Sequence, residues 1–511
     1  MRLSDAGKQP DRARQWQRGA LAAIGVSIAL IVAVAAAGPS AAVPAFPASP
    51  GRPPYLAHLS PSPVLVSFAL WLAVITGGAG VGAGLVAVRR GWRPRPRNVI
   101  IGSLLAVVAL MLVPPVGSTD IFDYAIYGRI AALGHSPYLM TPAQLRATGD
   151  PVGAIAPGPW AHIVSVYGPL ATATEKAASR LAGPSPALTL FWLKVWNAAA
   201  YLAIVAALDL VLRSDAAARA RAHLLWALNP LMLLAVMAGG HIDGLAAAAG
   251  AAGVLAFRRP TFNNAIVAGI LVGAAVAVKA PFALFGVGVA WAARRSPRAL
   301  AGAGLGAAAV LVPSYLIAGH RALTSLATKG AAGPVDLYEP WQLMYRLLGW
   351  AAPSHRVDEI AAIAAVLLAV LLLWRLPDGP PGLPAVRVAL ALALAWLVTS
   401  PQQRPWFDAM LFPLLAAMPA TRLDWIALWR LVVASAAELP GVTYYTGLRP
   451  LWLSGVNNVI SRGLAPLALT GLTVALIWLC VTRRWTPAQA EAAAAREPDR
   501  PLPETARKLT Q

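Results

Sequence analysis

Long apolar runs recur along the whole chain, and they constrain its fold more than any other feature of the sequence. About fourteen such runs can be counted in the 511 residues, and a helix needs roughly 20 apolar residues to cross the hydrocarbon core of a bilayer. Charged residues make up only 12% of the chain, about half of their usual share in soluble domains. The sequence therefore predicts an all-α, polytopic helical membrane protein with about fourteen transmembrane helices, and it excludes an ordinary soluble enzyme.

The positions of the runs divide the chain into three parts. Residues 1–18 are expected to form a cytoplasmic tail, residues 19–482 a transmembrane domain, and residues 483–511, rich in Ala, Pro and charge, a disordered cytoplasmic tail. The first run resembles a signal peptide, but a second run follows soon after it, so we interpret it as an uncleaved signal-anchor. The predicted spans are Ala20–Ala37, Val64–Val88, Val99–Val116, Ala187–Leu212, His223–Ala238, Gly244–Phe257, Ala265–Val278, Phe282–Ala293, Leu300–Ala318, Ile360–Trp374, Val386–Val398, Phe407–Met418, Trp425–Leu439 and Gly463–Val481.

Basic residues give the chain a net charge of +21, but their placement points away from nucleic acid as a partner. They lie between apolar runs, and the stretch Arg89–Arg97 holds five arginines in nine residues. Because short cytoplasmic loops are enriched in Lys and Arg, this loop is expected to face the cytoplasm, together with Arg258/Arg259 and Arg294–Arg298. Both termini are then cytoplasmic, and the long loop Gly117–Ser185 lies outside the plasma membrane.

Two carboxylates stand at the beginning of this outer loop. The segment Ser118–Gly134 directly follows the third span and is predicted to form an amphipathic helix along the outer interface. Asp120 and Asp123, at positions i and i+3, share one face of that helix. One interpretation is that Asp120 caps the helix and Asp123 completes a capping pair. The other is that Asp120, assisted or replaced by Asp123, is a catalytic base at the boundary between water and membrane.

Further polar residues are expected on the same face of the membrane. The turn Gly239–Gly244 places His241 and Asp243 between two spans, and either a capped turn or a functional pair fits that pattern. Lys279 ends a span just before a proline, where its ammonium either snorkels to the surface or meets an anion such as a phosphate. Arg404 is another outer cation with the same two interpretations.

A second interfacial helix is predicted after the segment Tyr167–Leu170. The apolar stretch that begins there carries Glu175, Lys176 and Arg180 at its polar positions. The outer loop therefore contains two interfacial helices.

Several chemistries have no support in the sequence. It contains no Walker motif, no dinucleotide-binding glycine turn and no Cys/His metal spacing, so neither nucleotide hydrolysis nor zinc chemistry is indicated. The single cysteine, Cys480, excludes an intramolecular disulfide. Arg430 and Glu438, near the ends of later spans, are interpreted as snorkelling or paired.

Four ordered motifs within residues 100–290 resemble one family. On them the chain resembles the GT-C class of membrane glycosyltransferases, specifically the actinobacterial polyprenol-phosphate-mannose-dependent α-1,6-mannosyltransferases. The motifs are Ser118–Gly128 followed by Gly134–Tyr138, Val166–Leu170, Asn229–Leu231 with Gly239–Leu245, and Val278–Pro281. Thr119, Asp123, Arg129 and Ile242 depart from the family pattern, so the sugar and the acceptor can differ from those of the family. The last third of the chain matches only in hydropathy and around Ser400–Trp406.

The resemblance implies a donor, an acceptor and a reaction for residues 19–482. The donor is a polyprenol-phosphate sugar, with mannose as the expected sugar, and the acceptor is a lipid-linked or cell-envelope glycan on the outer face. A phosphate that leaves the anomeric carbon is already a stable anion, so the site must supply cations and a base for the acceptor hydroxyl. Attack from the opposite face inverts the anomeric centre. No cofactor is required, although two carboxylates and a phosphate could hold a divalent metal.

This reaction assigns roles to the candidate residues. Asp120 and Asp123 are the catalytic candidates, and Lys279, Arg129 and Arg404 are the residues expected to hold the phosphate. The other substrate-binding candidates are Tyr127, Tyr138, Tyr167, His241, Asp243 and Trp406, with His241 and Asp243 placed at the sugar.

A polytopic lipid or glycolipid transporter, or a flippase, is the alternative function, because it also needs many spans and a few intramembrane charges. Such proteins are often built from internal repeats around a site at the bilayer midplane. We find no convincing repeat, and the polar candidates gather on one face of the membrane, which favours an enzyme. An inactive glycan-binding relative would carry the same features.

The orientation can be tested with single cysteines in a chain that lacks Cys480. A cysteine placed beside Arg93 should resist an impermeant thiol reagent added to intact cells, whereas one within the loop Gly117–Ser185 should react, because basic short loops remain cytoplasmic. Labelling of the Arg93 position from outside would reverse the predicted topology.

Overall fold

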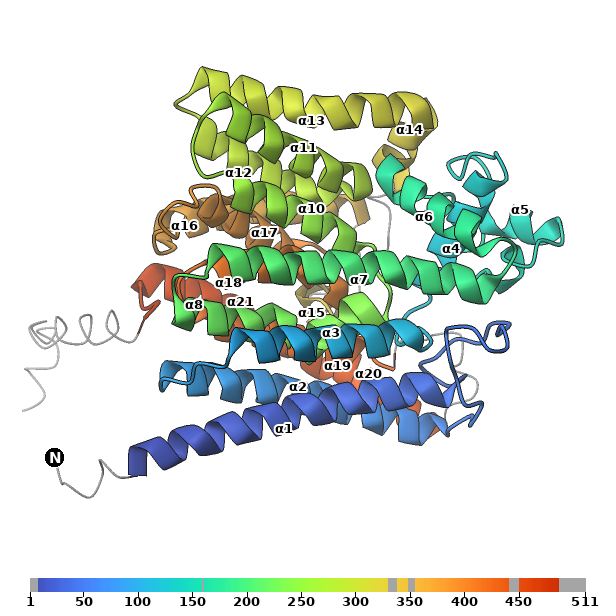
Figure 1. Cartoon of the computed structure of the whole chain (residues 1–511), viewed down its shortest axis with the longest axis horizontal. Coiled ribbons are helices and arrows are strands. Elements are labelled where there is room, and N and C mark those ends of the chain that lie inside the picture. Colours follow the sequence, from blue (N-terminus) through green and yellow to red (C-terminus); the bar gives the residue numbers. More distant parts are fainter. Residues whose placement is uncertain (1–7, 159, 330–337, 348–353, 441–449, 487–511) are drawn as a thin grey trace, which may run out of the picture.

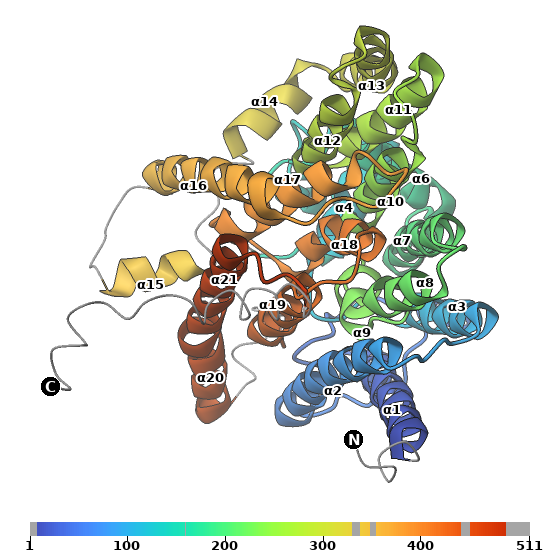
Figure 2. The same cartoon turned by 90° about the vertical axis from the view of Figure 1, so that its left-hand side faces the viewer.

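The structure, a computed structural model, describes residues 8–158, 160–329, 338–347, 354–440 and 450–486. Within these ranges every regular element is a helix and none is a strand. The long helices, from α1 (Lys8–Ala37) to α13 (Pro297–Ala318), run roughly parallel to one another (Figure 1). Figure 2 shows them nearly end-on, with α1 and α13 on opposite sides of the bundle.

Seven helices of the described ranges are long and apolar enough to cross a membrane, so the polytopic helical class is confirmed. They are α1, α2 (Pro63–Arg89), α7 (Pro186–Val211), the interrupted helix α8–η3 (Ala216–Ala238), α13, α16 (Ser354–Arg375) and α20–α21 (Leu451–Thr482). The other predicted spans overlap shorter helices, namely α3 (Pro96–Leu112), α10 (Asp243–Ala256), α11 (Phe262–Val278), η4–α12 (Ala280–Ala293), α17 (Val386–Thr399), η5–α18 (Pro405–Ala417) and α19 (Leu423–Glu438). The count of fourteen spans stays a prediction.

Serine followed by proline marks the beginning of several spans. Ser62, Ser185 and Ser296 each accept a hydrogen bond from the backbone N–H three residues further on, and a proline follows each serine as the first helical residue. The serine oxygen satisfies a backbone donor that has no partner within the helix, and the proline has no N–H to satisfy. These helices therefore begin at positions that the local sequence specifies.

The interrupted helix Ala216–Ala238 is the most enclosed of the seven long apolar helices, and its apolar window is wholly buried. Asn229 accepts a hydrogen bond from the Leu231 N–H, and Pro230 begins a new turn, which interrupts the helix. Trp226 stacks on Tyr201 of α7 with ring centroids 4.8 Å apart, and each side chain donates a hydrogen bond to the backbone carbonyl of the other residue. This reciprocal contact fixes the enclosed helix against α7.

The loop Gly117–Ser185, predicted to be the outer loop, contains α4 (Asp120–Ala132), α5 (Pro142–Ala147) and α6 (Pro169–Ala182), which lie together at one end of the bundle (Figure 1). The predicted helix at Ser118–Gly134 is confirmed, but its amphipathic placement on the surface is wrong. All but one of the residues from Ile121 to Ile130 are buried, and α6 and α7 pack against the helix. The sequence of α4 has too few polar positions to form a solvated face, so neighbouring helices cover it.

The predicted tails are only partly described. Helix α1 begins at Lys8, so the second half of the tail 1–18 is helical. Residues 1–7 and 487–511 lie outside the described residues, and they include nearly all of the tail 483–511.

Candidate active site

Four segments far apart in the sequence bring polar side chains together near the outer-loop helices. Asp120 is the first residue of α4, His241 lies in the turn before α10, and Asp243 is the first residue of α10. Lys279 ends α11 as its C-terminal cap, and Arg404 immediately precedes η5 (Pro405–Met410). Each of these positions is a helix terminus or a turn, where the regular hydrogen-bond pattern stops.

His241 is held in a fixed orientation against Asp120. Its Nδ1 lies 2.6 Å from the carbonyl oxygen of Ala235, which can only accept, so Nδ1 carries the proton. The ring stacks on Trp406 with centroids 3.6 Å apart and 11° between the planes. The other nitrogen, Nε2, has no hydrogen-bond partner and lies 3.7 Å from the Asp120 carboxylate. Burial lowers the pKa of His241 to about 4, so the ring is neutral and Nε2 presents a lone pair.

Asp120 is suited to accept a proton. Its side chain remains 24% exposed. Burial raises the pKa of the carboxyl above its ordinary value, while the charges of Arg404 and Lys279 and the hydroxyl of Ser118 oppose that rise. A carboxylate whose pKa moves toward the working pH is a better general base than an ordinary one. The structure therefore gives Asp120 an environment that strengthens its basicity.

The capping interpretation of the two carboxylates does not hold. Thr119 is the N-cap of α4 and makes no side-chain cap bond. The backbone N–H of Asp120 donates to the Ser118 hydroxyl at 3.1 Å, and the Asp123 Oδ1 has no partner. Neither carboxylate accepts a backbone hydrogen bond in the first turn of this helix.

Lys279 does not snorkel, because it is paired with Asp243. The Nζ lies 2.7 Å from Asp243 Oδ1 and 4.0 Å from the centroid of the Phe407 ring. The side chains of Lys279 and Asp243 are only 15% and 2% exposed. The second oxygen, Asp243 Oδ2, is buried without a partner. Because an ammonium has three donors, Lys279 keeps donor capacity beyond this ion pair.

The last third of the chain contributes two further ion pairs. Arg404 Nη1 lies 3.0 and 2.8 Å from the two oxygens of Glu438 at the end of α19. Arg430 of α19 forms a buried pair with Asp408 of η5 and also bonds Gln403. The prediction that Arg430 and Glu438 are snorkelling or paired is confirmed as pairing.

Two glycines allow the motif segments to pack against one another. Gly240 has a φ of +72°, and a Cβ there would lie 2.3 Å from the side chain of Ile121 in α4. A Cβ on Gly168 would lie 2.1 Å from the carbonyl oxygen of Ala277, and the Gly168 N–H donates to Val278 O at 3.0 Å. The Gly239–Gly244 turn thus packs on α4, and the Tyr167–Leu170 segment packs on the end of α11.

The remaining predicted binding residues lie in the packing of the outer loop. Tyr127 donates to the carbonyl of Ile163 at 2.8 Å, and the Tyr138 hydroxyl bonds Tyr167 O and Thr172 Oγ1 at 3.2 and 3.0 Å. Burial raises the pKa of both hydroxyls, so they stay protonated. They hold the loop together, and among the described residues neither hydroxyl forms a hydrogen bond with His241.

Arg129 lies away from the Asp120 cluster. It forms an ion pair with Asp150 at 2.8 Å, and nine residues of helix, about 13 Å, separate it from Asp120.

Tyr167 is partly buried and packs edge-on against Tyr124, with ring centroids 5.1 Å apart.

Two carboxyl groups between α4 and α6 have no partners. Glu175 is fully buried, and neither of its carboxylate oxygens has a hydrogen-bond partner. The prediction that Glu175 lies on the polar face of α6 is therefore wrong. Burial raises the pKa of Glu175 well above its ordinary value, and burial together with the charges of Asp120 and Glu175 does the same for Asp123. Because an ionised carboxylate without partners is costly in such surroundings, protonation of these groups is favoured.

Three residues of the site region were not predicted from the sequence. Tyr124 packs against Tyr167, and Phe407 lies beneath Lys279. Lys194 is fully buried in α7 and donates to the carbonyls of Val113 and Pro114 at 2.8 and 3.4 Å, which fixes the connection that leads to Asp120. A lysine within an apolar run was the available signal for Lys194, because such charges are rare and need partners. The aromatic residues gave no comparable signal.

No group of three or more His, Cys, Asp or Glu side chains in the described part of the chain could hold a metal ion. The groups predicted to bind the phosphate at this site are the amino group of Lys279 and the guanidinium group of Arg404. Their role toward a ligand remains a prediction.

The fold and the site define a polytopic helical membrane protein in which Asp120, His241, Asp243 and Lys279 converge at one end of the helices. A family model described as alpha-(1->6)-mannopyranosyltransferase, N-terminal domain, matches residues 22–295, which is more than half of the chain. The chain belongs to this family and is a mannosyltransferase. No curated protein matches it. The family match includes Asp120, His241 and Lys279, whereas Arg404 lies beyond it.

Glu175→Gln should raise the thermal unfolding midpoint at neutral pH and reduce its dependence on pH. The ordinary pKa of the carboxyl is 4.5, and the folded-state value is raised. Between these values the folded chain binds more protons than the unfolded chain, so stability falls as pH rises. Glutamine is neutral throughout. The measurement is the midpoint of the purified protein in detergent from pH 5 to pH 8.

Arg180→Gln is the matched control, since Arg180 is an exposed residue of the same helix. It should retain the pH slope of the wild type. A Glu175→Gln slope equal to that of the wild type would mean that Glu175 is ionised in the folded protein.

Proposed function

We propose that the chain transfers mannose from a polyprenol-phosphate donor to a lipid-linked or cell-envelope glycan, on the outer face of the plasma membrane and with inversion at the anomeric carbon. The observation that carries the proposal is the position of Asp120, which faces the unpartnered Nε2 of His241 and lies within the field of Lys279 and Arg404. A base and two cations are the groups that this transfer needs.

The proposed step moves one glycosyl group and one proton. The acceptor oxygen forms a bond to the anomeric carbon while the bond from that carbon to the phosphate oxygen breaks. The electron pair of the breaking bond leaves with polyprenol phosphate, and the hydroxyl proton passes to Asp120. Because Asp120 Oδ2 and His241 Nε2 are 3.7 Å apart and both accept hydrogen bonds, neighbouring hydroxyls of one sugar can bond them together.

The cations are proposed to bind the donor phosphate. Lys279 has donors beyond its bond to Asp243, and the Arg404 side chain is 37% exposed while it pairs with Glu438. A polyprenyl chain must remain in hydrocarbon while its phosphate stays at the boundary. Helix ends that carry Lys279 and Arg404 suit that depth, since both residues adjoin apolar helices.

The membership in a mannosyltransferase family favours the enzyme over a transporter or flippase. The position of the polar groups of the site also favours an enzyme, because these groups lie at helix ends and turns rather than along the middle of the spans. The polyprenol phosphate release assay in the next paragraph distinguishes an enzyme from an inactive glycan-binding relative.

Asp120→Asn should lower turnover by roughly two to four orders of magnitude, which is the usual contribution of a general base, and should leave donor binding largely intact. Asp123→Asn should have a smaller effect. The assay incubates purified protein with a polyprenol-phosphate sugar panel and a glycan acceptor, and measures the polyprenol phosphate released. Wild-type turnover should fall as pH falls through the pKa of Asp120, because the protonated carboxyl accepts no proton.

Full turnover of a well-folded Asp120→Asn protein would exclude this residue as the base. A wild-type protein that binds donor but releases no polyprenol phosphate with any sugar of the panel would support a binding role instead.

Lys279→Ala should weaken binding of a non-hydrolysable polyprenol-phosphonate sugar and slow transfer together, because the phosphate is charged in both the ground state and the transition state. Loss of this lysine also leaves Asp243 unpaired, which destabilises the fold. Asp243→Asn is therefore the matched variant, since it breaks the same ion pair but keeps the cation. Binding should fall more in Lys279→Ala than in Asp243→Asn.

Lys176→Ala removes a lysine of the outer loop and should bind donor as the wild type does. Lys279→Arg should retain only part of the donor binding and transfer activity, because a planar guanidinium differs in shape from an ammonium. Equal donor affinity in wild type and Lys279→Ala, with unchanged turnover, would remove Lys279 from the phosphate site and leave Arg404 as the cation to test.

A further inference from the structure

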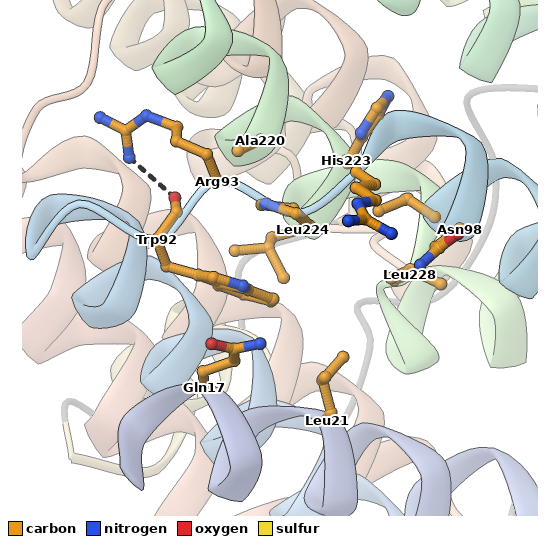
Figure 3. Close-up of a pocket in the computed structure, with 12 residues that line it drawn as sticks. Gln17, Leu21, Trp92, Arg93, Asn98, Ala220, His223, Leu224 and Leu228 are labelled. Atoms are coloured by element: carbon orange, nitrogen blue, oxygen red, sulfur yellow. Dashed lines mark hydrogen bonds between the residues drawn. The ribbon is translucent and has the colours of Figure 1, made fainter. Parts of the chain in front are cut away.

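A pocket of about 400 Å³ lies at the opposite end of the bundle from Asp120. It is formed where α1, the connection between α2 and α3, and the segment α8–η2 (Ala216–Ala227) meet (Figure 3). Helix α3 begins at the pocket and its 17 residues rise about 25 Å toward the outer loop. The pocket is therefore separate from the proposed mannosyltransferase site, and its size is within the usual range for small-molecule sites, about 300–1,000 Å³.

The polar side of this pocket is positively charged. Arg93 and Arg95 line it, and no Asp or Glu is among its lining residues. Arg93 bends back to donate to the carbonyl of Val88 at 2.7 Å. It also donates to the carbonyl of Trp92 at 2.8 Å (Figure 3). Arg95 is exposed, and its side chain makes no hydrogen bond or ion pair with the described part of the chain. It is also the N-cap of α3, whose first turn adds partial positive charge.

A carboxylate behind the pocket does not cancel this charge. His223 lines the pocket and bonds Asp209 at 2.9 Å. Both oxygens of Asp209 also bind Arg219, each at 2.5 Å. The charge of Asp209 is thus already balanced by Arg219, and the two arginines at the pocket keep a net positive potential.

The other side of the pocket is apolar. Leu21 of α1 and Leu224 line it, and the ring of Trp92 lies above Gln17 (Figure 3). Further along the two helices, α1 and α3 expose large apolar side chains, including Val26, Ile101 and Leu105. A site with cations at its rim and exposed apolar helix faces beyond suits an anionic amphiphile rather than a free anion.

We propose that this pocket binds the head group of an anionic glycerophospholipid in the leaflet that meets the basic loops. The guanidinium groups of Arg95 and Arg93 hold the phosphate beside the N-terminus of α3. The polar ends of Gln17 and Asn98 bond the head-group hydroxyls. The acyl chains lie along the exposed apolar faces of α1 and α3. The bound lipid joins α1 to the beginning of α3 and so stabilises this end of the bundle.

The test titrates purified full-length protein in detergent with short-chain phosphatidylglycerol and follows the thermal unfolding midpoint. Phosphatidylglycerol should raise the midpoint with saturation, whereas phosphatidylcholine of the same chain length, glycerol 3-phosphate and inorganic phosphate should raise it little. Arg95→Glu should increase the half-saturating concentration of phosphatidylglycerol by roughly five-fold or more, the scale expected for one basic group near an anionic lipid. The Arg95 side chain has no hydrogen bond or ion pair with the described residues to lose, so the fold should tolerate the change.

Arg258→Glu is the matched control, because Arg258 is exposed in another basic loop and does not line the pocket. Its half-saturating concentration should stay within about two-fold of the wild type, as expected for a surface charge remote from the lipid. Equal losses in the two variants would show a diffuse surface attraction and overturn the proposal. Stabilisation by phosphatidylcholine equal to that by phosphatidylglycerol, or saturation by inorganic phosphate alone, would overturn it as well.

Discussion

A backbone in hydrocarbon must satisfy its own hydrogen bonds, and an ionisable group there is costly, so this chain concentrates irregular backbone and charge at the ends of its helices. The ion pair of Lys279 with Asp243 follows that rule, because one residue ends α11 and the other begins α10. Asp120 begins α4, and His241 lies in a turn. The chemistry proposed for the protein is thus confined to a layer where water, phosphate and helix termini can meet, while the spans supply the frame that holds those termini in register.

Close packing turns this layer into a defined site. Gly240 and Gly168 bring two motif segments into contact with α4 and α11, where a larger residue would clash. Trp406 stacks on His241, and the bond from His241 Nδ1 to Ala235 fixes the tautomer, so that a lone pair faces Asp120. At the other end of the bundle, no Asp or Glu is among the described residues that line the pocket with Arg93 and Arg95, and the charge there remains available to a ligand. The two ends therefore differ in how completely their charges are paired.

Much of the architecture was predictable because membrane spans are specified locally. Each predicted apolar run overlaps a helix, and Ser-Pro steps mark several beginnings. The motif residues Asp120, His241 and Lys279 were correctly placed at helix termini or turns, because turn-forming residues and proline adjoin them. The errors concern which face of a helix is covered. Glu175 occupies a polar position in the pattern, yet α4 covers it completely, and the sequence of one helix does not state what packs on it.

The sequence by itself determined the helical membrane class, the positions of the apolar helices, the basic loops and the motifs that define the mannosyltransferase family, since all of these depend on short-range composition and order. Only the tertiary structure decided the partners. It paired Arg404 with Glu438 and Lys279 with Asp243, and it brought Trp406 onto His241 across more than 160 residues of chain. The physical reason is that an ion pair or a stacked ring depends on distance and orientation between segments, and these are fixed by how the helices pack rather than by the residues of any one of them.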